Sequence, residues 1–421
     1  MDFLPTTPPR ITRVRAKNFR SIKDIDIDLA NLTILVGANG SGKSNVIDIL
    51  KFVRDTIQRG LDQAILERHG LSSMRRWSAK GRPYNIYISI DIAGNNWEGE
   101  YSFSIGSGGV DSYKIKHEKL SLKHNSHTSE SQDDQNIIPP SNIEENDSSP
   151  KTTTLELELN DGVWVENKGI DTGSLGLRMS DTSEARDLII PGMIRSFNIS
   201  KEAYDFYVFM KNMGFYTIYP KILREPQKPS VPHPLEEDGQ NLASVLRDLK
   251  KNRENDTFTI SSALENVVEG VYDYSVSQVG GYLVTRLHHH PSSEDSSGPV
   301  FNLAQESDGT LRMLGILTAL YQNPPRSLVV IEEPELTIHP GALGVLCDVI
   351  KEASLRSQVI ITTHNPDLID RFSDEKILVV EKENGVTNVG GIISSQREAI
   401  REKLFSPGEL MRIQGLRKEQ D

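Results

Sequence analysis

Three short apolar runs along the chain end abruptly in glycine or in polar residues. They are Leu32–Val36, Leu328–Ile331 and the run within Ser357–Phe372 that ends at Thr362. An apolar run without alternating polar residues is typical of a parallel strand buried on both faces. Because ligands of open α/β sheets bind at the carboxyl ends of such strands, the residues that follow these runs are the candidates for chemistry.

A second pattern alternates apolar and polar residues with the period of a strand. It occurs in Asn85–Gly94, Trp97–Gly106, Ser112–Leu122 and Thr152–Gly169, and it predicts an antiparallel β-subdomain beside the core. Residues 123–151 interrupt it with a polar, acidic stretch rich in Pro, Ser and Asn. Such a stretch cannot bury a core, so we expect a disordered hairpin insertion. His124 and His127 in it have no supporting cluster of metal ligands, and we expect both to belong to a solvated linker.

From Ser183 to about Gly270 the apolar residues recur at helical spacing, most clearly in 201–213 and 241–252. This region predicts a helical lobe. No heptad pattern persists over three or four repeats, so we expect no coiled-coil arm.

Two hairpins are predicted after the helical region, with turns at Gly280-Gly281 and at Asn384-Gly385. The first leads into His288-His289-His290. Three consecutive histidines cannot all face one metal from a strand, so we expect them at the surface. Residues 394–421 are predicted to be helical and charged, without a catalytic set.

Composition narrows the class of protein. The chain has 421 residues, of which 37% are hydrophobic and 25% charged, and its formal net charge of −12 argues against a surface coated in basic residues. The single cysteine, Cys347, excludes an internal disulfide framework and fits a reducing compartment. No stretch of about 18 apolar residues occurs, so we expect a cytoplasmic protein without membrane contact.

The first apolar run leads into a complete phosphate-binding motif. Gly37, four further residues, Gly42, Lys43 and Ser44 have the GxxxxGK[ST] spacing between a strand and an amphipathic helix. Glycines let backbone N–H groups approach phosphate oxygens, Lys43 is predicted to reach the β- and γ-phosphates, and Ser44 to bind Mg²⁺. The predicted ATP-binding residues of this loop are Gly37, Ala38, Asn39, Gly40, Ser41, Gly42, Lys43, Ser44 and Asn45.

The second and third runs supply the remaining candidates. Glu332 occupies the position of a carboxylate that holds Mg²⁺, and Glu333 that of a base that activates water. An acidic helix N-terminus would explain one glutamate but not an apolar strand that ends in two. His364 ends the third strand, where we expect it to contact the γ-phosphate. The predicted catalytic residues are Lys43, Glu333 and His364.

These motifs, in this order, resemble the soluble ABC-type ATPases of the SMC, RecF and OLD-nuclease branch. Lys17-Asn18-Phe19-Arg20-Ser21 is similar to the NFRS element of that branch, and "EEPELTIHP" to its Walker B and D-loop. The resemblance implies an α/β fold, a P-loop NTPase of the ABC ATPase type with an antiparallel β-subdomain and an inserted helical lobe. It also implies that Arg20 contacts ATP. Glu335, in the region of the D-loop, is expected to affect coupling between sites more than chemistry.

The same resemblance implies a dimer. "ESDGTLRMLGILTAL" stands where the family has its signature motif, so that Ser307, Asp308 and Gly309 would meet the γ-phosphate of ATP bound to a second protomer. Residues 1–122 and 300–421 are then the two parts of the ATPase lobe, around the insertion 123–152 and the strands and helices of 153–299. Too few residues follow His364 for a Toprim nuclease domain. We therefore expect a separate effector, such as a nuclease or toxin, in a setting such as anti-phage defence.

Two alternatives remain at this stage. A RecF-like repair ATPase would grip DNA with basic residues, and these cluster at Arg10, Arg13, Arg15, Lys17, Arg20 and Lys23 and at Arg75, Arg76, Lys80 and Arg82. Scattered solubilising charge explains the two clusters equally well. The energy subunit of a membrane transporter is the weaker alternative, because the chain has no LSGGQ signature.

Overall fold

The computed structural model describes residues 8–77, 84–109, 112–125, 152–161, 163–168, 188–197, 199–251, 260–291, 298–372 and 375–419. The expected insertion therefore lies almost entirely outside the described residues, as do Lys80 and Arg82. None of the described helices is long and apolar enough to cross a membrane.

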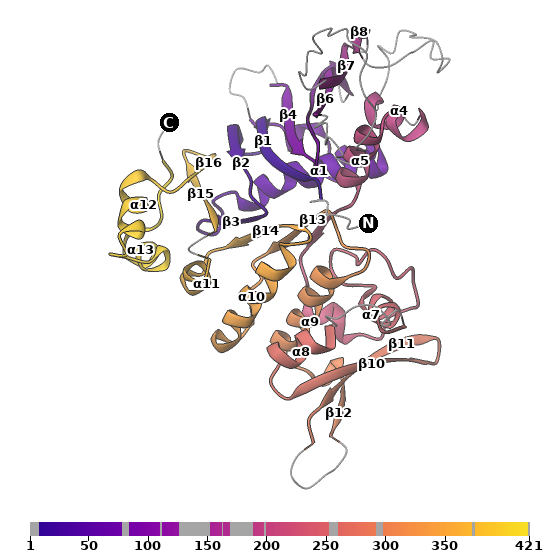
Figure 1. Ribbon diagram of the computed structural model, residues 1–421, viewed down its shortest axis with the longest axis vertical. Coiled ribbons are helices and arrows are strands. Elements are labelled where there is room, and N and C mark those ends of the chain that lie inside the picture. Colours follow the sequence, from indigo (N-terminus) through magenta and orange to yellow (C-terminus); the bar gives the residue numbers. More distant parts are fainter. Residues whose placement is uncertain are drawn as a thin grey trace, which may run out of the picture.

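A thirteen-stranded sheet runs through the molecule and has two halves of different construction (Figure 1). The antiparallel half has the order β8-β7-β6-β5-β4-β1-β2. The other half continues as β16-β15-β3-β14-β13-β9 and is parallel apart from the hairpin β15–β16. The strands are β1 (Arg10–Phe19), β2 (Ile22–Asp28), β3 (Leu32–Val36), β4 (Ile86–Ala93), β5 (Trp97–Gly109), β6 (Ser112–Asn125), β7 (Thr152–Asn160), β8 (Val163–Lys168), β9 (Met213–Tyr216), β13 (Leu328–Glu332), β14 (Gln358–Thr363), β15 (Lys376–Glu383) and β16 (Val386–Gly390).

Helices cover both faces of the parallel half, because its strands are apolar on both sides. In β13, Leu328 and Val330 belong to one hydrophobic core, and Val329 and Ile331 belong to a second core on the opposite face. The first core includes residues of α1 (Lys43–Arg59), α2 (Leu61–Leu66), α3 (Leu71–Met74), α4 (Ile189–Phe197) and α5 (Lys201–Lys211). The second includes residues of α6 (Pro220–Arg224), α7 (Leu242–Lys251), α8 (Ile260–Val267), α9 (Asp308–Tyr321), α10 (Leu343–Ala353), α11 (Pro366–Asp370) and α13 (Pro407–Gln414).

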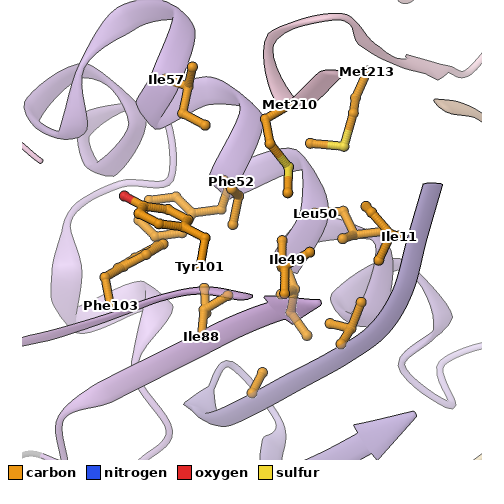
Figure 2. Close-up of a cluster of buried hydrophobic side chains, with 14 of the residues drawn as sticks. Ile11, Ile49, Leu50, Phe52, Ile57, Ile88, Tyr101, Phe103, Met210 and Met213 are labelled. Atoms are coloured by element: carbon orange, nitrogen blue, oxygen red, sulfur yellow. The ribbon is translucent and has the colours of Figure 1, made fainter. Parts of the chain in front are cut away.

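The antiparallel half buries one face only, as its alternating sequence predicts. Figure 2 shows Ile88 of β4 and Phe103 of β5 gathered against Ile49 and Phe52 of α1. The rings of Phe52 and Phe103 lie 6.2 Å apart. Helix α1, which follows the phosphate-binding loop, is thus held by the core of the β-subdomain.

The inserted lobe combines helices α6 to α8 with a three-stranded sheet. Its strands are β10 (Val271–Val279), β11 (Tyr282–His289) and β12 (Val300–Asn302), and the short helix η2 (Leu303–Gln305) leads from them to α9. The predicted hairpin turn is confirmed, with Gly280 and Gly281 both at positive φ. After β13, η3 (Pro340–Ala342) precedes α10, and α12 (Ser394–Arg401) lies near the end of the chain.

The fold class predicted from the sequence is confirmed, but two details differ. Residues 213–216, within the region expected to be helical, form β9 and pair with β13, because a short apolar run buried in the sheet has no helical or strand period of its own. The expected boundary at residue 122 falls within β6, and β7 continues the same sheet. His124 therefore lies in a strand, with Nδ1 3.2 Å from a carboxylate oxygen of Glu202, and the linker expectation is wrong for it.

Candidate nucleotide-binding and catalytic site

The phosphate-binding loop joins β3 to α1 in a conformation that depends on its glycines. Gly40 and Gly42 have φ of 77° and 108°, values that other residues rarely adopt. A Cβ on Gly42 would lie 2.1 Å from Oγ1 of Thr387. No side chain caps the first turn of α1, and the buried hydroxyl of Ser41 has no hydrogen-bond partner. Unpaired donors at a helix N-terminus suit a phosphate group, so the loop fits the nucleotide that its sequence predicts.

Lys43 is buried at the centre of this loop. Its Nζ donates to the carbonyls of Gly37 at 2.7 Å and Ala38 at 3.2 Å. Burial lowers the pKa of the ammonium, and the charges of Glu333 and Glu335 act in the opposite direction. A cation held this way, without a carboxylate hydrogen bond, is poised to exchange carbonyl oxygens for phosphate oxygens.

The predicted metal ligands lie next to each other. The Ser44 hydroxyl donates to Oε2 of Glu332 at 2.6 Å, although the two residues are far apart in the chain. A hydroxyl and a carboxylate are hard oxygen ligands of the kind that Mg²⁺ prefers. The donor set therefore fits one Mg²⁺ beside the phosphate loop.

Glu333 and His364 also come together. Nδ1 of His364 lies 3.1 Å from Oε1 of Glu333. Glu333 has a φ of 46°, unusual for a residue with a side chain, and its N–H donates to the carbonyl of Thr362 at 2.9 Å. The turn directs the carboxylate of Glu333 to the histidine at the end of β14, so that two of the three predicted catalytic residues are in direct contact.

Glu335 is more deeply placed than its position in the D-loop region indicates. It is buried, and its Oε1 accepts a hydrogen bond of 2.5 Å from the Thr363 hydroxyl, while Oε2 has no partner. Burial raises the pKa of this carboxyl. Glu335 therefore lies within the same protomer as Lys43 and Glu333, close enough for their charges to interact.

Two residues that were predicted to contact ATP form hydrogen bonds to protein side chains beside the loop. Arg20 donates to Asp48 of α1 at 2.6 Å, and the Asn45 amide donates to the Ser21 hydroxyl at 2.6 Å. Ser21 also shares a hydrogen bond with Thr387, whose hydroxyl donates to the carbonyl of Ser41 at 3.0 Å. Arg20 and Asn45 thus support α1 and the loop through neighbouring side chains.

The signature residues lie at the N-terminus of α9. Ser307 caps this helix by accepting from the N–H of Thr310 at 3.1 Å, and Asp308 forms an ion pair with Arg224. Ser307 and Gly309 line a cleft of about 820 Å³ together with residues 337–339 of the D-loop region. No residue of the phosphate-binding loop lines this cleft.

The first basic cluster is largely neutralised within the antiparallel half. Each of its central members pairs with a carboxylate, and the pairs are Arg13–Asp26, Arg15–Asp91, Arg15–Glu100, Lys17–Asp24 and Arg20–Asp48. All but the last of these pairs join strands of the sheet, and such pairs are ordinary on its exposed face. Asp48 belongs to α1. The pairs leave little net positive charge there for a DNA backbone.

The three histidines at the end of β11 each have a partner, and the expectation that all are at the surface is wrong for two. His288 and His289 are half-buried, and Nε2 of His289 lies 2.9 Å from Oε1 of Glu306, next to the signature. His290 lies near Glu265. Among the described residues no group of His, Cys, Asp and Glu is arranged to hold a metal ion.

One residue near the site was missed in the sequence. Arg312, in the second turn of α9, donates to the main-chain carbonyls of Glu332 and Glu333 at 3.2 and 2.9 Å. The signal was available, because an arginine stands alone among apolar residues in "LRMLGILTALY".

Comparison with known proteins finds two matching family models and several solved structures of similar fold. Residues 10–158 match a family described as "AAA ATPase domain", and residues 231–370 match one described as "AAA domain, putative AbiEii toxin, Type IV TA system". No protein of curated function matches the chain. The structure is similar to a crystal structure of an Smc head bound to the C-terminal winged-helix domain of ScpA, with a TM-score of 0.53 and 15% identity over 93% of this chain and 99% of that chain.

Two further SMC heads are similar at lower scores. The head domain from Thermotoga maritima has a TM-score of 0.41 and 14% identity, over 91% of this chain and 99% of that chain. The head domain with an extended coiled coil from Pyrococcus furiosus has a TM-score of 0.46 and 14% identity, over 94% and 99%.

Two family models of AAA-type domains thus match separate parts of the chain, and its fold is that of an SMC head. The NFRS and EEPE motifs of the chain agree with this fold, since they resemble those of the ABC-type ATPases of the SMC and RecF kind.

Proposed function

We propose that this chain is an ATP-hydrolysing switch that closes head-to-tail around two Mg-ATP molecules and thereby controls a separate effector protein. The observation that carries the proposal is the meeting of three strand ends at one point. Lys43 and Ser44 follow β3, Glu332 and Glu333 lie at the end of β13, and His364 follows β14. Hydrogen bonds join Ser44 to Glu332 and His364 to Glu333.

Binding is assigned to the loop and the end of β13. Lys43 would hold the β- and γ-phosphates, with the unpaired N–H groups at the start of α1 around them. Ser44 and Glu332 would hold Mg²⁺, which neutralises charge on the phosphates during their transfer. The three-dimensional arrangement of these donors fits one nucleotide per protomer.

Hydrolysis is assigned to Glu333. Its carboxylate would orient a water molecule for in-line attack and accept its proton, the role of a general base. The contact at 3.1 Å with His364 holds the carboxylate in one orientation. His364 would also face the γ-phosphate, because it ends the strand next to the phosphate-binding loop.

Closure of the dimer is assigned to the signature. Ser307 begins a helix of 14 residues whose N-terminus lines an open cleft, and an anion on a second protomer is a suitable ligand for such an end. Hydrolysis would remove the γ-phosphate that both protomers bind and reopen the pair, an order change of the type seen in nucleotide switches.

Control of an effector is supported by the comparisons. One matching family is described by a toxin of a toxin–antitoxin system, and the similar Smc head binds another protein, ScpA. We therefore propose a partner protein such as a toxin or nuclease in the cytoplasm, with anti-phage defence as the setting. The neutralised basic cluster makes DNA the less favoured partner.

The proposal is tested with two variants of adjacent carboxylates. Glu333→Gln should bind Mg-ATP like the wild type but hydrolyse it about 10²–10⁴-fold more slowly, the usual effect of losing a general base, and should accumulate as a dimer on size exclusion. Glu332→Gln should instead shift the Mg²⁺ dependence of ATP binding. Wild-type hydrolysis by Glu333→Gln would show that the base lies elsewhere.

A further inference from the structure

Arg312 links the signature helix to the candidate base. Its guanidinium leaves α9 and donates to the carbonyls of Ile218 at 3.0 Å, Glu332 at 3.2 Å and Glu333 at 2.9 Å. The residue is only 6% exposed. One side chain thus ties the second turn of α9 to the backbone at the end of β13.

The chemistry of this contact is not that of a structural ion pair. The hydrogen bonds recorded for the guanidinium all go to main-chain carbonyls, and its buried Nε has no partner. Burial lowers the pKa of Arg312, against the charges of Glu335 and Glu333. A buried cation without a carboxylate partner is a poor way to stabilise a fold, since an apolar side chain of similar volume avoids the desolvation cost. The position therefore has a geometric role.

The backbone that Arg312 contacts is strained. Glu333 has a φ of 46°, and a non-glycine residue keeps this conformation only where its surroundings hold it. The N–H of Glu333 donates to the carbonyl and the hydroxyl of Thr362, and its C=O accepts from Arg312 and from the N–H of Leu336. Arg312 thus supplies the bond that joins the carbonyl of this strained residue to α9.

A second contact between α9 and the same loop is independent of Arg312. Thr337 has a φ of 65°, and a Cβ on Gly309 would lie 2.7 Å from its carbonyl oxygen, so that the first turn of α9 packs directly on this peptide. The strained residues of the 333–337 loop are therefore the two whose carbonyls touch α9. A shift of the signature end of this helix would displace both.

We propose that Arg312 is a positioning residue that transmits the position of the signature end of α9 to the backbone of Glu333. The inference rests on the proposed function, because it assigns Glu333 to catalysis and the signature to a second protomer. Through this contact, ATP hydrolysis in one protomer would depend on whether the signature of the same protomer has bound the nucleotide of the second protomer.

The first test compares Arg312→Met with Arg312→Lys. Methionine removes every donor while filling the space, and lysine keeps a charge but cannot span carbonyls on both sides. Arg312→Met should lower kcat for ATP by about 10–100-fold, as a misplaced catalytic group does, while KM and the dissociation constant for Mg-ATP change less than about threefold. Arg312→Lys should recover part of kcat.

The second readout needs no activity. Hydrogen–deuterium exchange of the nucleotide-free protein should show faster exchange in the peptide that covers 328–338 in Arg312→Met, because the Glu333 amide is protected by a turn that Arg312 holds. Arg312→Lys should show an intermediate rate, and it also serves the test if the methionine variant does not fold.

Arg326 provides a matched control. It is 8% exposed, its Nε is buried without a partner, and it donates to Asn212 Oδ1 and to the carbonyl of Met213 at the other end of β13. Arg326→Met should raise exchange near residues 212–216, because the carbonyl of Met213 loses its donor, but leave kcat at the wild-type value.

The outcomes separate the two proposals. Wild-type kcat and wild-type exchange at 328–338 in Arg312→Met would overturn the inference, as would an equal loss of kcat in Arg326→Met. If the wild type itself hydrolyses no ATP, the proposed function fails, and the exchange measurement still decides whether Arg312 holds the Glu333 turn.

Discussion

The two halves of the sheet handle polar residues in opposite ways. In the parallel half, β3, β13 and β14 are buried almost throughout, and reactive side chains occur where the strands end. In the antiparallel half, charged residues occur along the strands, on the exposed face, and pair with opposite charges on neighbouring strands. Charge density alone is therefore a poor guide to the site.

The difference follows from solvation. A charge along an exposed face is hydrated, so its pair contributes little and is replaceable. A charge at the end of a buried strand is partly desolvated, and it interacts strongly with whatever approaches. Lys43, with its pKa lowered by burial, and Glu335, with its pKa raised by burial, belong to this second kind.

The largest expected effect is the loss of Lys43. Lys43→Ala should weaken Mg-ATP binding by at least about 100-fold, the worth of one strong charge-assisted hydrogen bond, measured by calorimetric titration. Lys51→Ala, on the same helix but paired with Glu237, is the control and should bind normally. If Lys43→Ala binds Mg-ATP with wild-type affinity, then the nucleotide does not bind at the parallel half of the sheet.

A substitution at the signature tests whether the start of α9 takes part in a dimer. Ser307→Arg should leave ATP binding intact but prevent the ATP-dependent dimer, because a bulky cation would collide with the facing loop. Ser307→Ala loses the helix cap, at about 1 kcal/mol, but keeps the space and should still dimerise. If both variants form the same fraction of dimer on size exclusion with ATP, then Ser307 only caps α9.

The pH dependence of stability tests whether Glu335 is buried. A folded-state pKa above the ordinary value of 4.5 means that the carboxyl stabilises the fold fully below the pKa of the unfolded chain, and that this contribution is lost as pH rises through the folded pKa. Glu335→Gln cannot ionise, so its unfolding temperature relative to the wild type should rise with pH above about 4.5. Parallel curves for the two proteins would contradict the burial argument.

The smallest effect is expected on the exposed face. The double variant Arg13→Gln, Lys17→Gln removes two cations that are already paired, so DNA affinity at low salt and the unfolding temperature should change little. A wild-type DNA affinity that falls steeply with salt and is lost in the double variant would instead favour the RecF-like alternative.

The sequence predicts local parts of the site well and long-range parts poorly. The phosphate-binding loop is one continuous segment, so its spacing alone specifies the role predicted for Lys43 and Ser44. The burial of Glu335 depends on Thr363, in another strand, and no local pattern shows it. The pairing of Arg13 and Arg15 with carboxylates depends on strand register in the same way.

Arg312 is a different kind of omission. Its partners are main-chain carbonyls, which every residue has, so they leave no trace in the sequence. Strand β9 escaped prediction because its four residues are buried and follow a helix without a break in composition. In both cases tertiary context decides what local pattern cannot.

Thr387 gives the sheet a mechanical property. It pairs with Ile22 where the two halves meet, bonds to Ser21 on the antiparallel side, and donates to the carbonyl of Ser41 inside the phosphate-binding loop. The space beside Gly42 is filled by the same side chain. Thr387 therefore connects both halves of the sheet to the phosphate-binding loop. A twist between the two halves would also change the shape of the loop that receives the phosphates.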